Sequence, residues 1–140
     1  MSSIVPDFLP VDAAIVATLQ AGLPGLQAVY RYGSAGGTFA RAESDLDLAV
    51  LANHPIPFEE LSRLTVELMR FSRCDIDLND MRRLPVTLRV QIVAEGCRLF
   101  AAEVGTADEY AAHTLADYAR LNEERKFILG DVRRRGSIYG

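Results

Sequence analysis

The sequence predicts an α/β or α+β domain in which helices flank a small mixed sheet and a long helix comes last. Short apolar, β-branched runs alternate with amphipathic segments, in the order helix, strand, strand, helix, strand, helix, helix. The strands are too few for a Rossmann sheet. Of the 140 residues, 49% are hydrophobic and 24% are charged. That composition is typical of a globular chain long enough to bury one core.

The first half of the sequence predicts one helix and two strands. Apolar positions recur at helical spacing from Asp12 to Ala21, and Gly22 follows. The aromatic and β-branched run Leu26–Tyr32 predicts a strand, and the small residues after it suit a tight turn and a short helical segment. Asp45–Ala52 predicts a second strand, because its later residues are apolar on both faces, as in a buried central strand.

The second half predicts two shorter helices, a third strand and the long helix. Phe58–Phe71 is amphipathic, with Leu61, Leu64, Leu68 and Phe71 on one face. The remaining expected elements are a strand at Cys74–Leu78, a helix at Pro85–Glu95, a short extended piece at Cys97–Ala101 and a helix that Thr106 caps and that continues to about Arg135. We expect one domain over 1–140, with a core of about 12–104 and the C-terminal helix over about 106–135.

Charge and hydropathy exclude several classes of protein. The net charge is −4, and up to residue 60 there are seven acids but two arginines. Nucleic-acid binding requires many phosphates to be neutralised, so we expect no direct nucleic-acid partner. No apolar run approaches the ~20 residues that span a bilayer, which predicts a cytoplasmic protein without a membrane partner. Cys74 and Cys97 lack metal-type spacing and are expected to be ordinary thiols.

Three aspartates predict a metal site. Asp45 and Asp47 lie on one side of a strand, roughly 6–7 Å apart at ~3.3 Å per residue, so both can reach one cation. Asp77 on the next strand is the natural third ligand, although Asp75 shares its face and stays an alternative. Mg²⁺ is typically held by one or two carboxylates with substrate phosphates, and two ions together clamp an in-line displacement at phosphorus.

The residues before these aspartates suit a phosphate. A strand that ends at Gly33-Ser34, followed by small residues and a helical turn, presents backbone N–H groups to an anion, and the Ser34 hydroxyl adds a donor. A Gly-Ser step or an Asp-x-Asp step alone is more often a plain turn or a solvated strand entry. Together, and with Asp77 on a third strand, they indicate nucleotidyl or phosphoryl transfer from a nucleoside triphosphate.

The same residues resemble a known family. Gly33-Ser34, ten intervening residues that end in Ser44, and Asp45-Leu46-Asp47 follow the pattern of the minimal nucleotidyltransferases of the DNA polymerase β-like superfamily. Ile76-Asp77-Leu78, Pro85 and the segment Ile92–Leu99 (IVAEGCRL) match its later pattern. The likeness is greatest to the MNT antitoxins encoded beside HEPN ribonuclease toxins. It implies the minimal nucleotidyltransferase fold for most of the chain.

The resemblance also implies an activity. In the family, an antitoxin of a type VII-like toxin–antitoxin system transfers AMP from ATP to a tyrosine hydroxyl of its HEPN toxin and so silences the ribonuclease. It implies that two Mg²⁺ ions are held by Asp45, Asp47 and Asp77, and that Asp77 helps deprotonate the acceptor. It implies a hetero-oligomer with the toxin. The phosphate-binding residues it implies are Gly33, Ser34, Gly36, Gly37 and Ser44.

Two other functions stay open at this point. Related enzymes adenylylate small molecules such as aminoglycosides, but they usually need further helical regions for the acceptor. A binder that neutralises its partner stoichiometrically is the other alternative, because Gly37-Thr38 departs from the usual glycine position of the family's loop. The three aspartates argue against that second alternative, since unneutralised carboxylates repel one another. We further expect Asp80 in a turn before Arg82 and Arg83, and Tyr30 and Tyr32 in the core.

Overall fold

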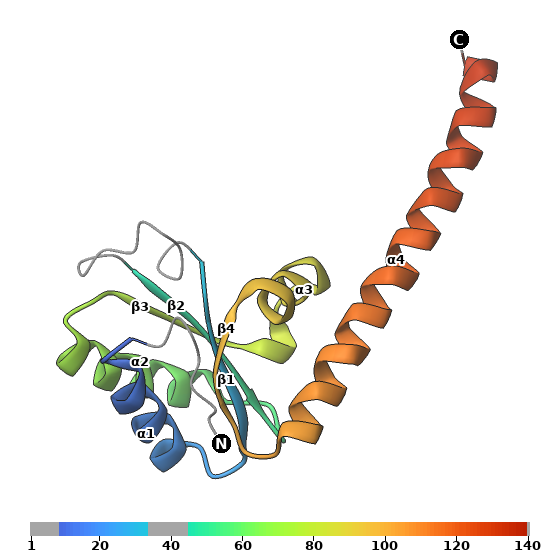
Figure 1. Cartoon of the computed structure of the whole chain (residues 1–140). Coiled ribbons are helices and arrows are strands. Elements are labelled where there is room, and N and C mark those ends of the chain that lie inside the picture. The colour runs from blue at the N-terminus through green and yellow to red at the C-terminus, as the bar shows by residue number, and fades with distance from the viewer. Residues whose placement is uncertain (1–8, 34–44, 140) are drawn as a thin grey trace.

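The computed structural model describes residues 9–33 and 45–139, with side chains described up to residue 130. Its elements follow the predicted order, and Figure 1 shows the long last helix reaching away from the sheet. The elements are α1 (Asp12–Gly22), β1 (Leu26–Tyr32), β2 (Leu46–Ala52), α2 (Phe58–Ser72), β3 (Ile76–Asp80), a one-turn 3₁₀ helix (Met81–Arg83), α3 (Val86–Glu95), β4 (Cys97–Ala101) and α4 (Val104–Tyr139).

The four strands form one mixed sheet in the order β3-β2-β1-β4. β1 pairs antiparallel with both β2 and β4, whereas β2 and β3 run parallel. The long α2 connects these two parallel strands, as a parallel pair requires. The expected mixed sheet is confirmed, and Cys97–Ala101 is a full edge strand.

Helices cover both faces of this sheet (Figure 1). One face packs against α1 and α2, and the buried residues there include Ile15, Leu48 and Leu64. The other face packs against α3 and the first turns of α4, through residues such as Ala49 and Ile92. Because strand residues alternate between faces, each strand supplies side chains to both cores.

Several predicted bounds were wrong. β3 begins at Ile76, two residues later than expected, and its last residue is Asp80. The expectation that Asp80 lies in a turn is corrected: it is buried, and its carboxylate accepts hydrogen bonds from the backbone N–H of Ile56 (3.2 Å) and of Arg82 (3.1 Å). The last helix begins before the expected Thr106 and continues past Gly130 to Tyr139, and Phe71 is 41% exposed.

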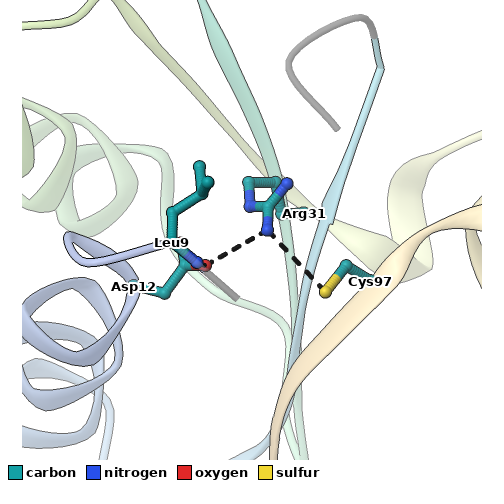
Figure 2. Close-up of polar contacts among 4 residues, drawn as sticks. All are labelled: Leu9, Asp12, Arg31 and Cys97. Atoms are coloured by element: carbon teal, nitrogen blue, oxygen red, sulfur yellow. Dashed lines mark hydrogen bonds and ion pairs between the residues drawn. The ribbon is translucent and has the colours of Figure 1, made fainter. Parts of the chain in front are cut away.

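A buried ion pair joins α1 to the end of β1. Arg31 and Asp12 are 1% and 0% exposed, and Arg31 Nη2 lies 3.1 Å from Asp12 Oδ2. The same nitrogen donates to Cys97 Sγ at 3.8 Å, and Asp12 Oδ2 also accepts from the Leu9 N–H at 2.5 Å (Figure 2). Three elements that are distant in sequence therefore meet at one guanidinium, beside the strand end that leads to Gly33.

The other whole-chain expectations concern the membrane and the cysteines. Among the helices of the described residues, none combines the length and apolar character that crossing a membrane requires. Cys74 and Cys97 are both half-buried thiols.

Candidate active site

Three side chains form a row across the sheet. Tyr32 on β1 pairs with Asp47 on β2, and Asp47 pairs with Asp77 on β3. Directly paired residues on neighbouring strands project to the same face, so Tyr32, Asp47 and Asp77 lie side by side. The row lies on the sheet face that α3 packs against. It is at the edge of that face where β1 ends and where β2 and β3 begin (Figure 1).

Asp45 joins the same group of carboxylates. It lies directly before β2, two residues from Asp47, and is exposed. Burial raises the pKa of the Asp47 carboxyl, and the negative charges of Asp77 and Asp45 raise this pKa further. The three charges are thus close enough to act on one another, and such a group favours a proton or a cation.

Gly33 touches this group from the end of β1. Its φ is +83°, in the left-handed region that glycine adopts without strain. A Cβ placed on residue 33 would overlap Asp47 Oδ2, so the backbone approaches the carboxylate more closely than any side chain permits. The other predicted loop residues, Ser34, Gly36, Gly37 and Ser44, lie outside the described residues.

Asn79 belongs to the same face and was missed by the sequence reasoning. It lies two residues after Asp77 on β3, and its Nδ2 donates to the Tyr32 hydroxyl at 3.2 Å. Burial raises the pKa of the Tyr32 hydroxyl, the Asn79 hydrogen bond lowers it, and the charges of Asp47 and Asp77 raise it. The strand period of two was the available signal, because it places Asn79 on the face of Asp77.

The structure separates the two candidate third aspartates. Asp77 lies opposite Asp47 in the β2–β3 register. Asp75 precedes β3, and its backbone carbonyl accepts the Leu46 N–H at 2.8 Å. The aspartates that raise the pKa of Asp47 are Asp77 and Asp45. The carboxylate brought beside Asp47 is therefore that of Asp77.

The donor set suits a hard divalent cation. Carboxylate oxygens are preferred ligands of Mg²⁺, and a cation would neutralise the repulsion that raises the pKa of Asp47. Within the described residues, no three His, Cys, Asp or Glu side chains are arranged to hold a metal ion. Asp45, Asp47 and Asp77 nevertheless share one end of the sheet.

The fold and the carboxylate row together define the class of protein. Residues 14–103 match the family described as polymerase β, nucleotidyltransferase, and the chain belongs to that family. Among characterised proteins, it is 32% identical over 119 residues to the protein adenylyltransferase MntA of Shewanella oneidensis, and the match covers 84% of each chain.

Solved structures of toxin–antitoxin proteins also match most of this chain. One is a tri-AMPylated Shewanella oneidensis HEPN toxin in complex with an MNT antitoxin, with 28% identity and a TM-score of 0.72, over 88% of this chain and 96% of that one. Another is a toxin–antitoxin structure with AMP-PNP, with 32% identity and a TM-score of 0.75, over 87% of this chain and 98% of that one. The fold predicted from the sequence is confirmed.

Proposed function

We propose that this chain is the antitoxin of a type VII-like HEPN/MNT toxin–antitoxin system and transfers AMP from ATP to a tyrosine hydroxyl of its HEPN toxin. The carboxylate row Asp47–Asp77 beside Gly33 carries the proposal, because it places acidic ligands against a backbone turn that suits phosphate. The likeness to MntA supports a protein acceptor. The acceptor tyrosine lies next to the ribonuclease site of the toxin, so its AMP group silences the toxin.

Each residue of the site has a role in this reaction. Asp45, Asp47 and Asp77 would hold two Mg²⁺ ions, which when bound supply positive charge to the triphosphate and to the leaving pyrophosphate. The backbone of Gly33 and the hydroxyl of Ser34 bind phosphate oxygens. Gly36, Gly37 and Ser44, which lie outside the described residues, are the further phosphate-binding residues of this proposal.

The transfer itself is a displacement at the α-phosphorus of ATP. The tyrosine oxygen forms a bond to this phosphorus as the bond to the pyrophosphate oxygen breaks. The exposed carboxylate of Asp77 accepts the phenolic proton, because it lies at the open end of the row. Pyrophosphate leaves with the electron pair of the broken bond. The reaction takes place in the cytoplasm, and the antitoxin and toxin form a hetero-oligomer without nucleic acid or membrane.

The direct test combines the purified chain, labelled ATP, Mg²⁺ and the toxin encoded beside it. We expect an AMP adduct on a toxin tyrosine by mass spectrometry and loss of ribonuclease activity. Asp45→Asn/Asp47→Asn should lower the transfer rate at least about 100-fold. Asp117→Asn is the matched control, since Asp117 is a surface acid paired with Arg120 on α4, and it should transfer at the wild-type rate.

The two alternative functions give different outcomes in the same assay. A stoichiometric binder would leave the toxin unmodified yet neutralised, and the double variant would neutralise it equally well. A small-molecule enzyme would transfer AMP to an added aminoglycoside and leave the toxin active. Either result would overturn the proposed function.

A further inference from the structure

A groove runs along the outer edge of β3, next to the carboxylate row. Its volume is about 380 Å³, and it lies between the first turns of α2 and the segment that follows β3. Besides the strand itself, the residues that line it include Phe58, Ser62, Thr65, Arg83 and Leu84. Asp77 also lines it, so the groove includes one of the three carboxylates of the candidate reaction centre.

The backbone of β3 faces this groove as an edge strand. β3 is the outermost strand on its side of the described sheet. The carbonyl of Asp75 points to β2, because it accepts the Leu46 N–H. Successive residues of a strand turn their backbone groups to opposite sides, so Asp77 points to β2 and Ile76 and Leu78 point outward. Outward N–H and C=O groups are a template for an added strand.

The side chains around the groove suit a peptide. Phe58 at the start of α2 is 73% exposed, so its ring is available for apolar contact. Ser62 and Thr65 bring hydroxyl groups, and the half-exposed Arg83 brings a cation 3.8 Å from the carboxylate of Asp80. Apolar contact, hydrogen-bonding groups and a free strand edge are the three elements with which proteins bind extended segments.

We propose that this groove is the acceptor site: an extended segment of the toxin, carrying the tyrosine, pairs with β3 as an added strand. The inference rests on the proposed function and names the surface that brings the acceptor to Asp77. A toxin segment paired with the outer edge of β3 runs past Asp77. A side chain of that segment can therefore reach the Asp77 carboxylate, which takes the phenolic proton. Register along β3 then selects which tyrosine is modified.

Blocking the groove tests the proposal. Ser62→Arg places a long side chain in the groove from the outer surface of α2, and Phe58→Ala removes the exposed aromatic ring without opening the core. We expect each variant to raise the KM for the toxin about tenfold or more, with the affinity for AMP-PNP and the melting temperature unchanged. Phe58→Ala keeps the test valid if Ser62→Arg folds poorly.

A second surface hollow supplies the matched control. It lies between α1 and α2 and is lined by Thr18, Arg63 and Glu67 among others. Thr18→Arg introduces the same side chain there, and the kinetics for ATP and toxin should stay at wild-type values. If Ser62→Arg and Phe58→Ala also leave the KM for the toxin unchanged, the acceptor site lies elsewhere and the inference is overturned.

Amide hydrogen exchange tests strand addition directly. In the complex with the toxin, exchange at the outward amides of Ile76 and Leu78 should slow at least about tenfold, because each N–H gains an acceptor. Unchanged exchange at both amides would exclude pairing with β3. If the wild-type chain transfers AMP to the toxin but these amides stay unprotected, only the acceptor groove is refuted. If no AMP is transferred at all, the proposed function and the groove are refuted together.

Discussion

A methyl group at residue 33 would occupy the space of the Asp47 carboxylate, and it would sit on a backbone with φ of +83°. Gly33→Ala therefore combines left-handed strain of about 1–2 kcal/mol with displacement of a metal-ligand candidate. We expect AMP transfer to fall at least about tenfold. Steady-state kinetics with ATP and toxin, together with denaturant unfolding, measure both effects.

Gly105 provides the control for that substitution. A Cβ on this residue of α4 meets no heavy atom within 4 Å. Gly105→Ala should leave transfer unchanged and raise stability by up to about 1 kcal/mol, because alanine favours a helix. Equal activity losses in the two variants would show that Gly33 has no special role.

The charge of Asp47 works against the stability of the metal-free protein. Its pKa is raised in the folded state by burial and by the charges of Asp77 and Asp45. The folded state thus holds the proton more tightly than the unfolded state, and this stabilisation is complete below the ordinary pKa of 3.8 and is lost as the pH rises through the raised value. At neutral pH, where Asp47 is ionised, the folded protein lacks this stabilisation.

Asp47→Asn should accordingly abolish transfer yet raise the melting temperature at pH 7. The advantage over the wild-type chain should shrink as the pH falls toward 4, because the wild-type carboxyl then becomes neutral as well. Thermal unfolding in a chelator at both pH values measures the difference. An advantage that is constant with pH would contradict the assigned cause.

At the scale of elements, the Arg31–Asp12 pair joins α1, β1 and β4 beneath the candidate site. Arg31→Met leaves the Asp12 carboxylate buried beside an apolar side chain and should cost about 3–5 kcal/mol in the free energy of unfolding. Asp12→Leu/Arg31→Met should recover most of that loss, since it removes both charges. Denaturant unfolding of the three proteins gives the values.

The exposed pair Arg120–Asp117 is the comparison for that experiment. Arg120→Met should change stability by less than about 0.5 kcal/mol, because exposed ion pairs contribute little. If Arg31→Met were equally mild, the buried pair would not hold the three elements together.

Local sequence pattern predicted the helices and strands better than it predicted which charged side chains are buried and what they contact. The period of α2 identified Leu61, Leu64 and Leu68 as its buried face, and all three are buried. The alternation of β2 placed Asp47 opposite the core-facing leucines. Arg31 entered the sequence reasoning only as one of two arginines in the charge count, because nothing within β1 reveals that Asp12 of another element neutralises it. The burial of Asp80 was missed for the same reason, since its partner Ile56 lies 24 residues away.

At the scale of the whole molecule, α4 extends beyond the body that the sheet and the other helices form (Figure 1). Residues 123–129 are all exposed, including Phe127, Ile128 and Leu129. A chain that ends after Asn122 should therefore melt within about 3 °C of the full chain, because the side chains of residues 123–129 contribute little buried surface. Thermal unfolding at equal concentrations provides the comparison.

Ile92→Ala shows whether that experiment would detect a real loss. Ile92 is fully buried between α3 and the sheet, and its truncation should lower the melting temperature by about 6 °C or more. A comparable fall on removal of 123–140 would mean that the end of α4 packs onto the rest of the molecule. The interpretation of 1–140 as one domain stays a prediction.

The sequence by itself determined the fold class and the face that carries the aspartates. Strand alternation and helical period are local properties, so spacing along the chain is enough to place Asp45 and Asp47 on one side and to mark Gly33 as a turn. Tertiary structure decided which carboxylate lies opposite Asp47, how Arg31 is neutralised and where the groove beside Asp77 opens. Strand register and burial arise from packing between segments far apart in the chain, so residue spacing within one segment cannot predict them.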